Sequence, residues 1–172
     1  MIDLDGLAAR AAELVSARGE TIAVAEGSCG GRISAALLAV PGASAYFRGG
    51  AVVYTAAARR AFLDGTIDLP EGLRGATEGW AAYLAESVRR RVGTSWGVGE
   101  GGAAGPTGNR YGDPAGHAWV AVGGPTDDAV VARSVLTGSA DRADNMVAFA
   151  AAALALLIER LESASTQPAS SS

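Results

Sequence analysis

Lysine is absent from this chain of 172 residues, so all 14 of its basic side chains are arginine. Without lysine, the chain cannot form a Schiff base, a Walker-type phosphate site or a serine–lysine catalytic pair. Cysteine and histidine occur once each, as Cys29 and His117. A single cysteine excludes an internal disulfide, and one residue of each type is too few for a metal site built from cysteine and histidine.

Long apolar runs and clusters of positive charge are also missing. The longest apolar stretch, residues 148–158, is alanine-rich and shorter than the roughly 18 residues that a membrane-spanning helix needs. The first residues have neither the basic start nor the apolar centre of a signal peptide. The net charge is −4 without a basic stripe, which disfavours nucleic-acid binding. We therefore expect a cytoplasmic protein with neither a membrane nor a nucleic acid as its partner.

The residues that are present indicate alternating helices and strands around clustered glycines. Apolar spacing and capping residues predict helices over residues 4–18, 32–40, 56–63, 77–92 and 141–161. Short apolar runs predict strands over residues 21–26, 50–55, 95–99, 117–122 and 129–136. This order is typical of the α/β class, and we expect a three-layer α/β/α sandwich on a mixed sheet of about five strands. One domain is expected over residues 1–162, followed by a disordered tail over residues 163–172.

Three segments carry residues suited to chemistry. The turn from Gly27 to Gly31 lies between a strand and a helix, where backbone N–H groups can face an anion, although a plain structural turn stays equally open. The segment 102–108 opens a loop of about 16 residues, which is longer than most connections in a compact domain. Tyr54 could donate a hydrogen bond and Arg59 could hold an anion, but a half-buried tyrosine and a solvated arginine explain these residues as well.

Taken together, these segments resemble the nicotinamide-nucleotide amidase family, also known as the CinA C-terminal domain. The resemblance extends over residues 4–160, and its matching stretches are residues 25–31, 41–44, 54–59, 102–108, 113–116 and 140–142. It implies a hydrolase that removes ammonia from the carboxamide of nicotinamide mononucleotide. It also implies a serine nucleophile helped by a lysine and a tyrosine, no metal or redox cofactor, and association into a homo-oligomer.

The chain departs from the family pattern at the reactive positions. Aligned without gaps, the family serine falls on Gly27, its lysine falls on Arg59, and a later lysine falls on Asp113. Glycine has no side chain to react, and an arginine stays charged and cannot act as a base. An alternative alignment with a shifted gap makes Ser28 the nucleophile. The catalytic candidates are therefore Ser28, Tyr54 and Arg59.

Further candidates come from the glycine-rich turns and from neighbouring polar groups. The expected ligand-binding residues are Gly27, Cys29, Gly30, Gly31, Gly102, Gly105, Pro106, Thr107 and Arg142. Glu26 and Glu100 end neighbouring predicted strands, so either carboxylate could activate a water or could only accept hydrogen bonds from loop amides. His117 could act as a base or serve the structure. The Cys29 thiol lies near a helix N-terminus, where its pKa would fall, or it is a small packing residue.

Two functions follow, and both imply a small-molecule nucleotide as the partner. The first is a divergent amidase-like hydrolase that cleaves the carboxamide of a pyridine nucleotide or a similar small amide. The second is a non-catalytic nucleotide-binding or regulatory domain, which the missing lysine and the glycine at the serine position favour. A third hypothesis makes the chain chiefly an oligomerising partner, through the alanine-rich helix over residues 143–157 and through Trp80.

Overall fold

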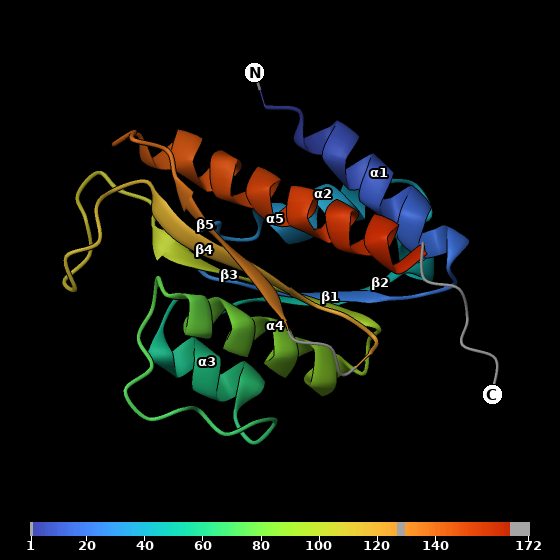
Figure 1. Ribbon diagram of the computed structural model, residues 1–172, viewed down its shortest axis with the longest axis horizontal. Helices are drawn as coiled ribbons and strands as arrows, with labels where there is room; N and C mark the ends of the chain where they lie inside the picture. The colour runs from blue at the N-terminus through green and yellow to red at the C-terminus, as the bar shows by residue number, and fades with distance from the viewer. Residues whose placement is uncertain (1, 127–129, 166–172) are drawn as a thin grey trace.

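A five-stranded mixed sheet forms the middle layer of the protein (Figure 1). The computed structural model describes residues 2–126 and 130–165. The strands lie in the order β2-β1-β3-β4-β5, with bounds β1 Ile22–Glu26, β2 Phe47–Val52, β3 Trp96–Ala103, β4 His117–Gly123 and β5 Val131–Leu136. β1 pairs in parallel with β2 and β3, whereas β3, β4 and β5 pair antiparallel. The predicted mixed sheet is therefore confirmed.

Helices cover both faces of this sheet. One face carries α1 (Leu4–Ala17), α2 (Arg32–Ala39) and α5 (Arg142–Ser165), and the other carries α3 (Ala56–Leu63) and α4 (Glu78–Val92) (Figure 1). A short 3-10 helix, η1 (Ala43–Ala45), precedes β2. The larger buried cluster joins the first face to α1, α2 and α5, and two smaller clusters join the second face to α4. The predicted α/β/α sandwich is confirmed.

The helix boundaries follow from capping residues that the sequence contains. The Asp3 carboxylate accepts a hydrogen bond from the Gly6 amide at 2.9 Å, at the start of α1. The hydroxyl of Thr77 caps α4 in the same way, and Gly93 ends that helix in the left-handed conformation, with φ 72°. These contacts satisfy backbone groups that a helix leaves unpaired at its ends.

The structure corrects two strand predictions. β3 continues through Gly101 and Gly102, which were expected to lie in a loop, because these glycines pair with Trp119 and Ala118 of β4. A Cβ on Gly102 would lie 2.5 Å from the Cβ of Ala118, so glycine is needed here for close packing rather than for a turn. The connecting loop consequently covers only residues 104–116.

The other correction concerns β2, which begins and ends three residues before the predicted range of 50–55. Its pairing with β1 begins at Phe47 and shifts register after it, so that Gly49 lies opposite Ala23. At the end of the chain, α5 continues to Ser165, past the predicted start of the tail. The rest of that tail, residues 166–172, and the predicted start of β5 at residue 129 lie outside the described residues.

None of the helices in the described part of the chain is long and apolar enough to cross a membrane.

Two glycines of β3 let the sheet approach α4 closely. A Cβ added to Gly99 would lie 2.6 Å from the Ala85 amide nitrogen and closer still to the carbonyl oxygen of Ala81. A Cβ added to Gly97 would meet the carbonyl oxygen of Ala85. These obstacles are backbone atoms, which cannot move aside as a flexible side chain can. The helix therefore lies against the strand at a distance that only glycine permits.

We expect Gly99→Ala to lower the free energy of unfolding by about 1–3 kcal/mol or more, because the added methyl overpacks this contact. Chemical denaturation followed by circular dichroism measures the change. Gly49→Ala is the matched control, since Gly49 is also a strand glycine but no heavy atom lies within 4 Å of an added Cβ. Equal stabilities of the two variants would contradict the prediction.

Candidate functional site

The turn between β1 and α2 presents a serine at the carboxyl ends of the parallel strands. Gly30 and Gly31 have φ angles of 66° and 99°, in the region that favours glycine, and they reverse the chain before α2 begins. Ser28 is 4% exposed, and Cys29 is fully buried. Ligands in open α/β sheets commonly bind at this edge, where loops leave the strand ends.

Two fully buried glutamates hold this turn in place. Glu26 and Glu100 are register partners on β1 and β3. The carboxylate of Glu26 accepts hydrogen bonds from the amides of Ile33 at 3.1 Å and Ser34 at 3.0 Å, and from the Ser34 hydroxyl at 2.7 Å. Glu26 therefore caps the beginning of α2, where the helix dipole also favours a negative charge.

Glu100 binds the turn itself. Its Oε2 accepts hydrogen bonds from the amides of Gly27 at 3.0 Å and Cys29 at 2.9 Å. Its Oε1 accepts a short hydrogen bond from the hydroxyl of Ser28. Burial raises the pKa of Glu100, the bonds from Ser28 and Cys29 oppose that rise, and the neighbouring charge of Glu26 adds to it.

Burial also controls Cys29. It raises the pKa of the thiol well above its usual range, and the charges of Glu100 and Glu26 raise it further. Of the two alternatives for Cys29, a lowered pKa near the helix N-terminus is therefore wrong, and the structure agrees with a small packing residue. The physical reason is that the side chain points into the core beside two carboxylates, and both conditions disfavour a thiolate.

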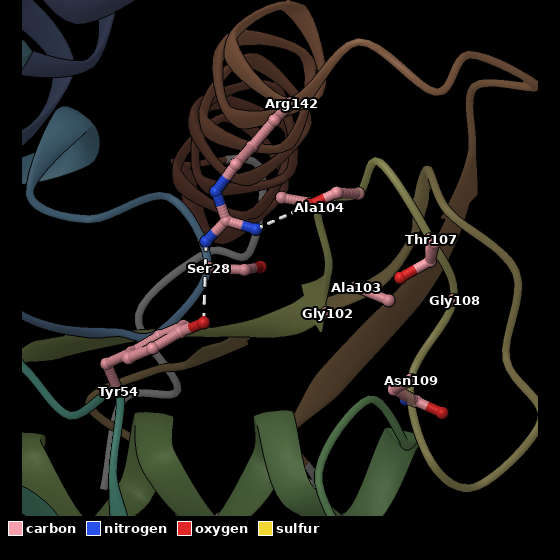
Figure 2. Close-up of a pocket in the computed structure, with 10 residues that line it drawn as sticks. Ser28, Tyr54, Gly102, Ala103, Ala104, Thr107, Gly108, Asn109 and Arg142 are labelled. Carbon is pink, nitrogen blue, oxygen red and sulfur yellow. Dashed lines mark hydrogen bonds between the residues drawn. The ribbon is translucent and has the colours of Figure 1, made fainter.

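Two adjoining pockets open above Ser28. The first has a volume of about 240 Å³ and is lined by Ser28, Tyr54, Gly102, Ala103, Ala104, Gly105, Thr107, Gly108, Asn109 and Arg142 (Figure 2). The second has a volume of about 190 Å³ and is lined by Gly27, Ser28, Val53, Tyr54, Gly75, Ala76, Trp80, Gly101, Gly102, Asn109 and Tyr111. Because both pockets share Ser28, Tyr54, Gly102 and Asn109, they form one bipartite site.

Arg142 connects the two sides of the first pocket. It is the first residue of α5, and its Nη1 donates a hydrogen bond to the carbonyl oxygen of Gly105 at 2.7 Å. Its Nη2 donates to the hydroxyl of Tyr54 at 3.4 Å. Figure 2 shows the guanidinium reaching over the pocket toward Tyr54, with Thr107 and Asn109 on the opposite loop. A fixed positive charge therefore faces the space above Ser28.

Asn145 anchors the loop that carries Gly105. This fully buried side chain donates hydrogen bonds through Nδ2 to the carbonyl oxygens of Ala104 and Ser139, each at 2.8 Å. Its Oδ1 accepts a short hydrogen bond from the hydroxyl of Thr137. One side chain thus ties the loop after β3 to the segment before α5, which places Gly105 beside Arg142.

Arg59 and His117, two of the polar side chains considered from the sequence, point elsewhere. The guanidinium of Arg59 forms a short ion pair with Asp64 and donates a hydrogen bond to the Tyr83 hydroxyl at 3.3 Å, and Arg59 lines neither pocket. The Nε2 of His117 lies 3.2 Å from the carbonyl oxygen of Ala76, a structural contact. The expectation that Arg59 contributes to the site does not agree with this geometry, because α3 turns its side chain toward α4.

Asp113, at the second family lysine position, holds the long loop. Its Oδ2 accepts from Arg74 at 2.7 Å and from Asn109 at 2.8 Å, and these bonds lower the pKa of its carboxyl group. Asn109 is thereby positioned to line both pockets.

The structure thus brings most of the predicted site together. Predicted residues that line the pockets are Gly27, Ser28, Tyr54, Gly102, Gly105, Thr107 and Arg142. Four other predicted residues lie in the turns but line neither pocket: Cys29, Gly30, Gly31 and Pro106. Asn109, Trp80 and Tyr111 were not predicted, and they reach the site only because a loop and a helix from different parts of the chain meet there. In the described residues, no cluster of three or more His, Cys, Asp or Glu side chains is arranged to hold a metal ion.

Comparison with known proteins identifies a matching family. Residues 4–161 match the profile of the CinA C-terminal domain.

The chain belongs to the CinA C-terminal domain family.

Sequence relatives and solved structures extend this match. A CinA-like protein of Parasynechococcus marenigrum is 40% identical over 121 residues, which are 70% of this chain and 29% of that protein. A CinA-like protein of an Anaeromyxobacter species is 39% identical over 137 residues, which are 80% of this chain and 33% of that protein. This CinA C-terminal domain therefore spans about a third of the length of these relatives.

Solved structures of similar length have the same fold. The competence damage-inducible protein A of Klebsiella pneumoniae superimposes with a TM-score of 0.84 at 25% identity, covering 93% of this chain and 98% of that one. The competence/damage inducible protein CihA of Agrobacterium tumefaciens gives 0.82 at 28% identity, covering 92% and 95%. This chain therefore has the same overall fold as these solved structures.

We expect Asn145→Asp to destabilise this domain by about 2–3 kcal/mol. The substitution removes the two hydrogen bonds that Nδ2 donates, and it places a carboxylate oxygen next to the carbonyl oxygens of Ala104 and Ser139. Urea denaturation at neutral pH measures the change. The control is Asp144→Asn, an exposed change at the adjacent position, for which we expect about 0.5 kcal/mol or less. A similar small effect for Asn145→Asp would show that the loop does not depend on this side chain.

Proposed function

We propose that this CinA C-terminal domain is an amidohydrolase that cleaves the carboxamide of a small anionic molecule with a flat ring, such as a pyridine nucleotide, and releases ammonia. The observation that carries the proposal is the position of Ser28. Its hydroxyl lies where the two pockets meet and is hydrogen-bonded to a buried carboxylate. A hydroxyl in that position is the expected nucleophile for acyl transfer.

The first pocket supports an anionic group on the substrate. Arg142 supplies a positive charge, and its planar donors suit a phosphate or carboxylate. The hydroxyl of Thr107 and the amide of Asn109 add further polar groups on the facing loop. Glycines 102, 105 and 108 also line this pocket.

The second pocket supports a flat, weakly polar ring. Its walls include Trp80, Tyr111 and Tyr54 together with Val53 and Ala76. Trp80 stacks on Tyr83 with ring centroids 5.8 Å apart, so the indole is already held in position before a ligand binds. Aromatic walls favour stacking of a planar ring, and a ring placed there would bring an attached carboxamide to Ser28.

Tyr54 has a supporting role in this proposal. Its hydroxyl oxygen accepts from Arg142, which leaves its own hydrogen available to donate to a carboxamide oxygen as negative charge develops on it. Arg59 has no role at the reacting atoms, because it is paired with Asp64 and Tyr83.

One observation favours the alternative of a non-catalytic nucleotide-binding domain. The Ser28 hydroxyl already makes a hydrogen bond that closes the turn, and the side chain is only 4% exposed. In that case the bipartite pocket would bind the same ligand without turnover. Self-association, expected from the family resemblance, remains a separate prediction that light scattering tests.

We expect the purified protein to release ammonia from nicotinamide mononucleotide, and we expect Ser28→Ala to reduce the rate at least about 1000-fold, because the nucleophile is removed. A coupled ammonia assay with mass spectrometry of the product measures both. Cys29→Ala is the matched control, since its buried thiol faces the core and its removal leaves Ser28 in place. Absence of turnover by the wild type on nicotinamide mononucleotide and on related nucleotide amides would exclude the amidase.

We expect Arg142→Gln to weaken binding of the same nucleotide about 10–100-fold, because a charge-assisted contact to an anionic group is lost. Isothermal calorimetry with the Ser28→Ala protein measures affinity without turnover. The matched control is Arg133→Gln, which removes an arginine that pairs with Glu159 outside both pockets. Unchanged affinity of the Arg142 variant would place the anionic group elsewhere.

A further inference from the structure

We propose that Glu100 is the general base that activates Ser28, in place of the lysine that the chain lacks. This inference rests on the proposed function, since it names the proton acceptor of the same reaction. It begins from a contact: Oε1 of Glu100 accepts the hydrogen bond of the Ser28 hydroxyl, so a proton leaving Ser28 has an acceptor already in line.

The carboxylate is held for this task by the backbone. Oε2 of Glu100 accepts the hydrogen bonds from the backbone amides of Gly27 at 3.0 Å and Cys29 at 2.9 Å. Oε1 is therefore left facing Ser28, and the carboxylate cannot rotate without breaking two hydrogen bonds. Orientation of a base by groups behind it is a general requirement for efficient proton transfer.

The other candidate bases are engaged elsewhere. Arg59 remains charged and is paired with Asp64, and His117 contacts the carbonyl oxygen of Ala76. Glu26 uses both carboxylate oxygens on α2 amides and on the Ser34 hydroxyl. Within the described residues, Glu100 is the titratable side chain that is hydrogen-bonded to Ser28.

The environment of Glu100 suits a base. It is fully buried, and none of the described ion pairs includes it. The titratable groups that face it are Glu26 on β1 and Cys29 in the turn. Burial raises the pKa of Glu100, so its carboxylate binds a proton more readily than an exposed glutamate does.

The reaction balances with these groups. Ser28 Oγ forms a bond to the carboxamide carbon as its proton passes to Glu100. The C–N bond then breaks, and the proton on Glu100 leaves with the nitrogen as ammonia. A water attacks the resulting ester and gives one proton to Glu100. The bond from carbon to Ser28 Oγ breaks, Glu100 returns the proton to that oxygen, and a carboxylic acid is released.

The test follows the reactivity of Ser28 separately from the choice of substrate. A small fluorophosphonate labels activated serines, and peptide mass spectrometry measures the rate of labelling at Ser28. We expect Glu100→Gln to lower this rate about 100-fold or more, in line with the usual contribution of a general base, and Glu100→Asp to give a smaller loss. The control is Glu86→Gln, which removes a half-buried carboxylate that pairs with Arg89 and Arg90 and lines neither pocket, and we expect its rate to stay within a few-fold of wild type.

The pH dependence gives a second readout that needs no variant. Because the deprotonated carboxylate is the base, labelling of the wild type should fall as pH drops through the raised pKa of Glu100, above the range of an exposed glutamate. This readout decides the question if Glu100→Gln fails to fold, as judged by circular dichroism. A wild-type rate that does not change through that range would overturn the proposal.

Further outcomes of these measurements are also decisive. Equal labelling of wild type and Glu100→Gln, or an equal loss in Glu86→Gln, would overturn the role of Glu100. Failure of the folded wild type to label at Ser28 would overturn it as well. Labelling that depends on Glu100 without ammonia release would refute the amidase alone, whereas ammonia release that survives Glu100→Gln would refute the base alone.

Discussion

The arrangement of this protein depends on two carboxylates buried side by side at the ends of β1 and β3. Glu26 and Glu100 are register partners on parallel strands, and neither is exposed. Burying them is tolerated because each accepts several hydrogen bonds from one short segment, residues 27–34. That segment is consequently held at both ends, and the position of Ser28 follows from the sheet register rather than from the turn alone.

Close packing of the layers brings the remaining walls of the pocket to this point. Glycines in β3 allow α4 to approach the sheet, and α4 carries Trp80 into the second pocket. On the opposite face, Asn145 and Arg142 in the first turns of α5 hold the loop after β3. Residues from helices on both faces of the sheet therefore line the site, and β3 lies between these helices.

The departures from the family pattern have a common structural meaning. At the two lysine positions, Arg59 and Asp113 form ion pairs with Asp64 and Arg74, and these pairs hold α3 and the long loop. Gly27 leaves the first position of the turn without a side chain, while Ser28 occupies the next one and reaches Glu100. The pocket is lined by residues of the matching segments, and Ser28 lies one residue after the position that the gapless alignment gives to the family serine.

Sequence alone indicated the layers, the helix caps and the succession of helices and strands along the chain, because apolar periodicity and capping depend on neighbouring residues. It also indicated the turn at Gly27 and the loop at Gly102. Only the tertiary structure decided that Gly101 and Gly102 belong to a strand, that Arg59 turns away, and that the pKa of Cys29 rises. Each of these depends on atoms that are distant in sequence, such as Ala118, Tyr83 and Glu100. The pairing of Ser28 with Glu100 has the same origin, since 72 residues separate them and only the sheet register brings them together.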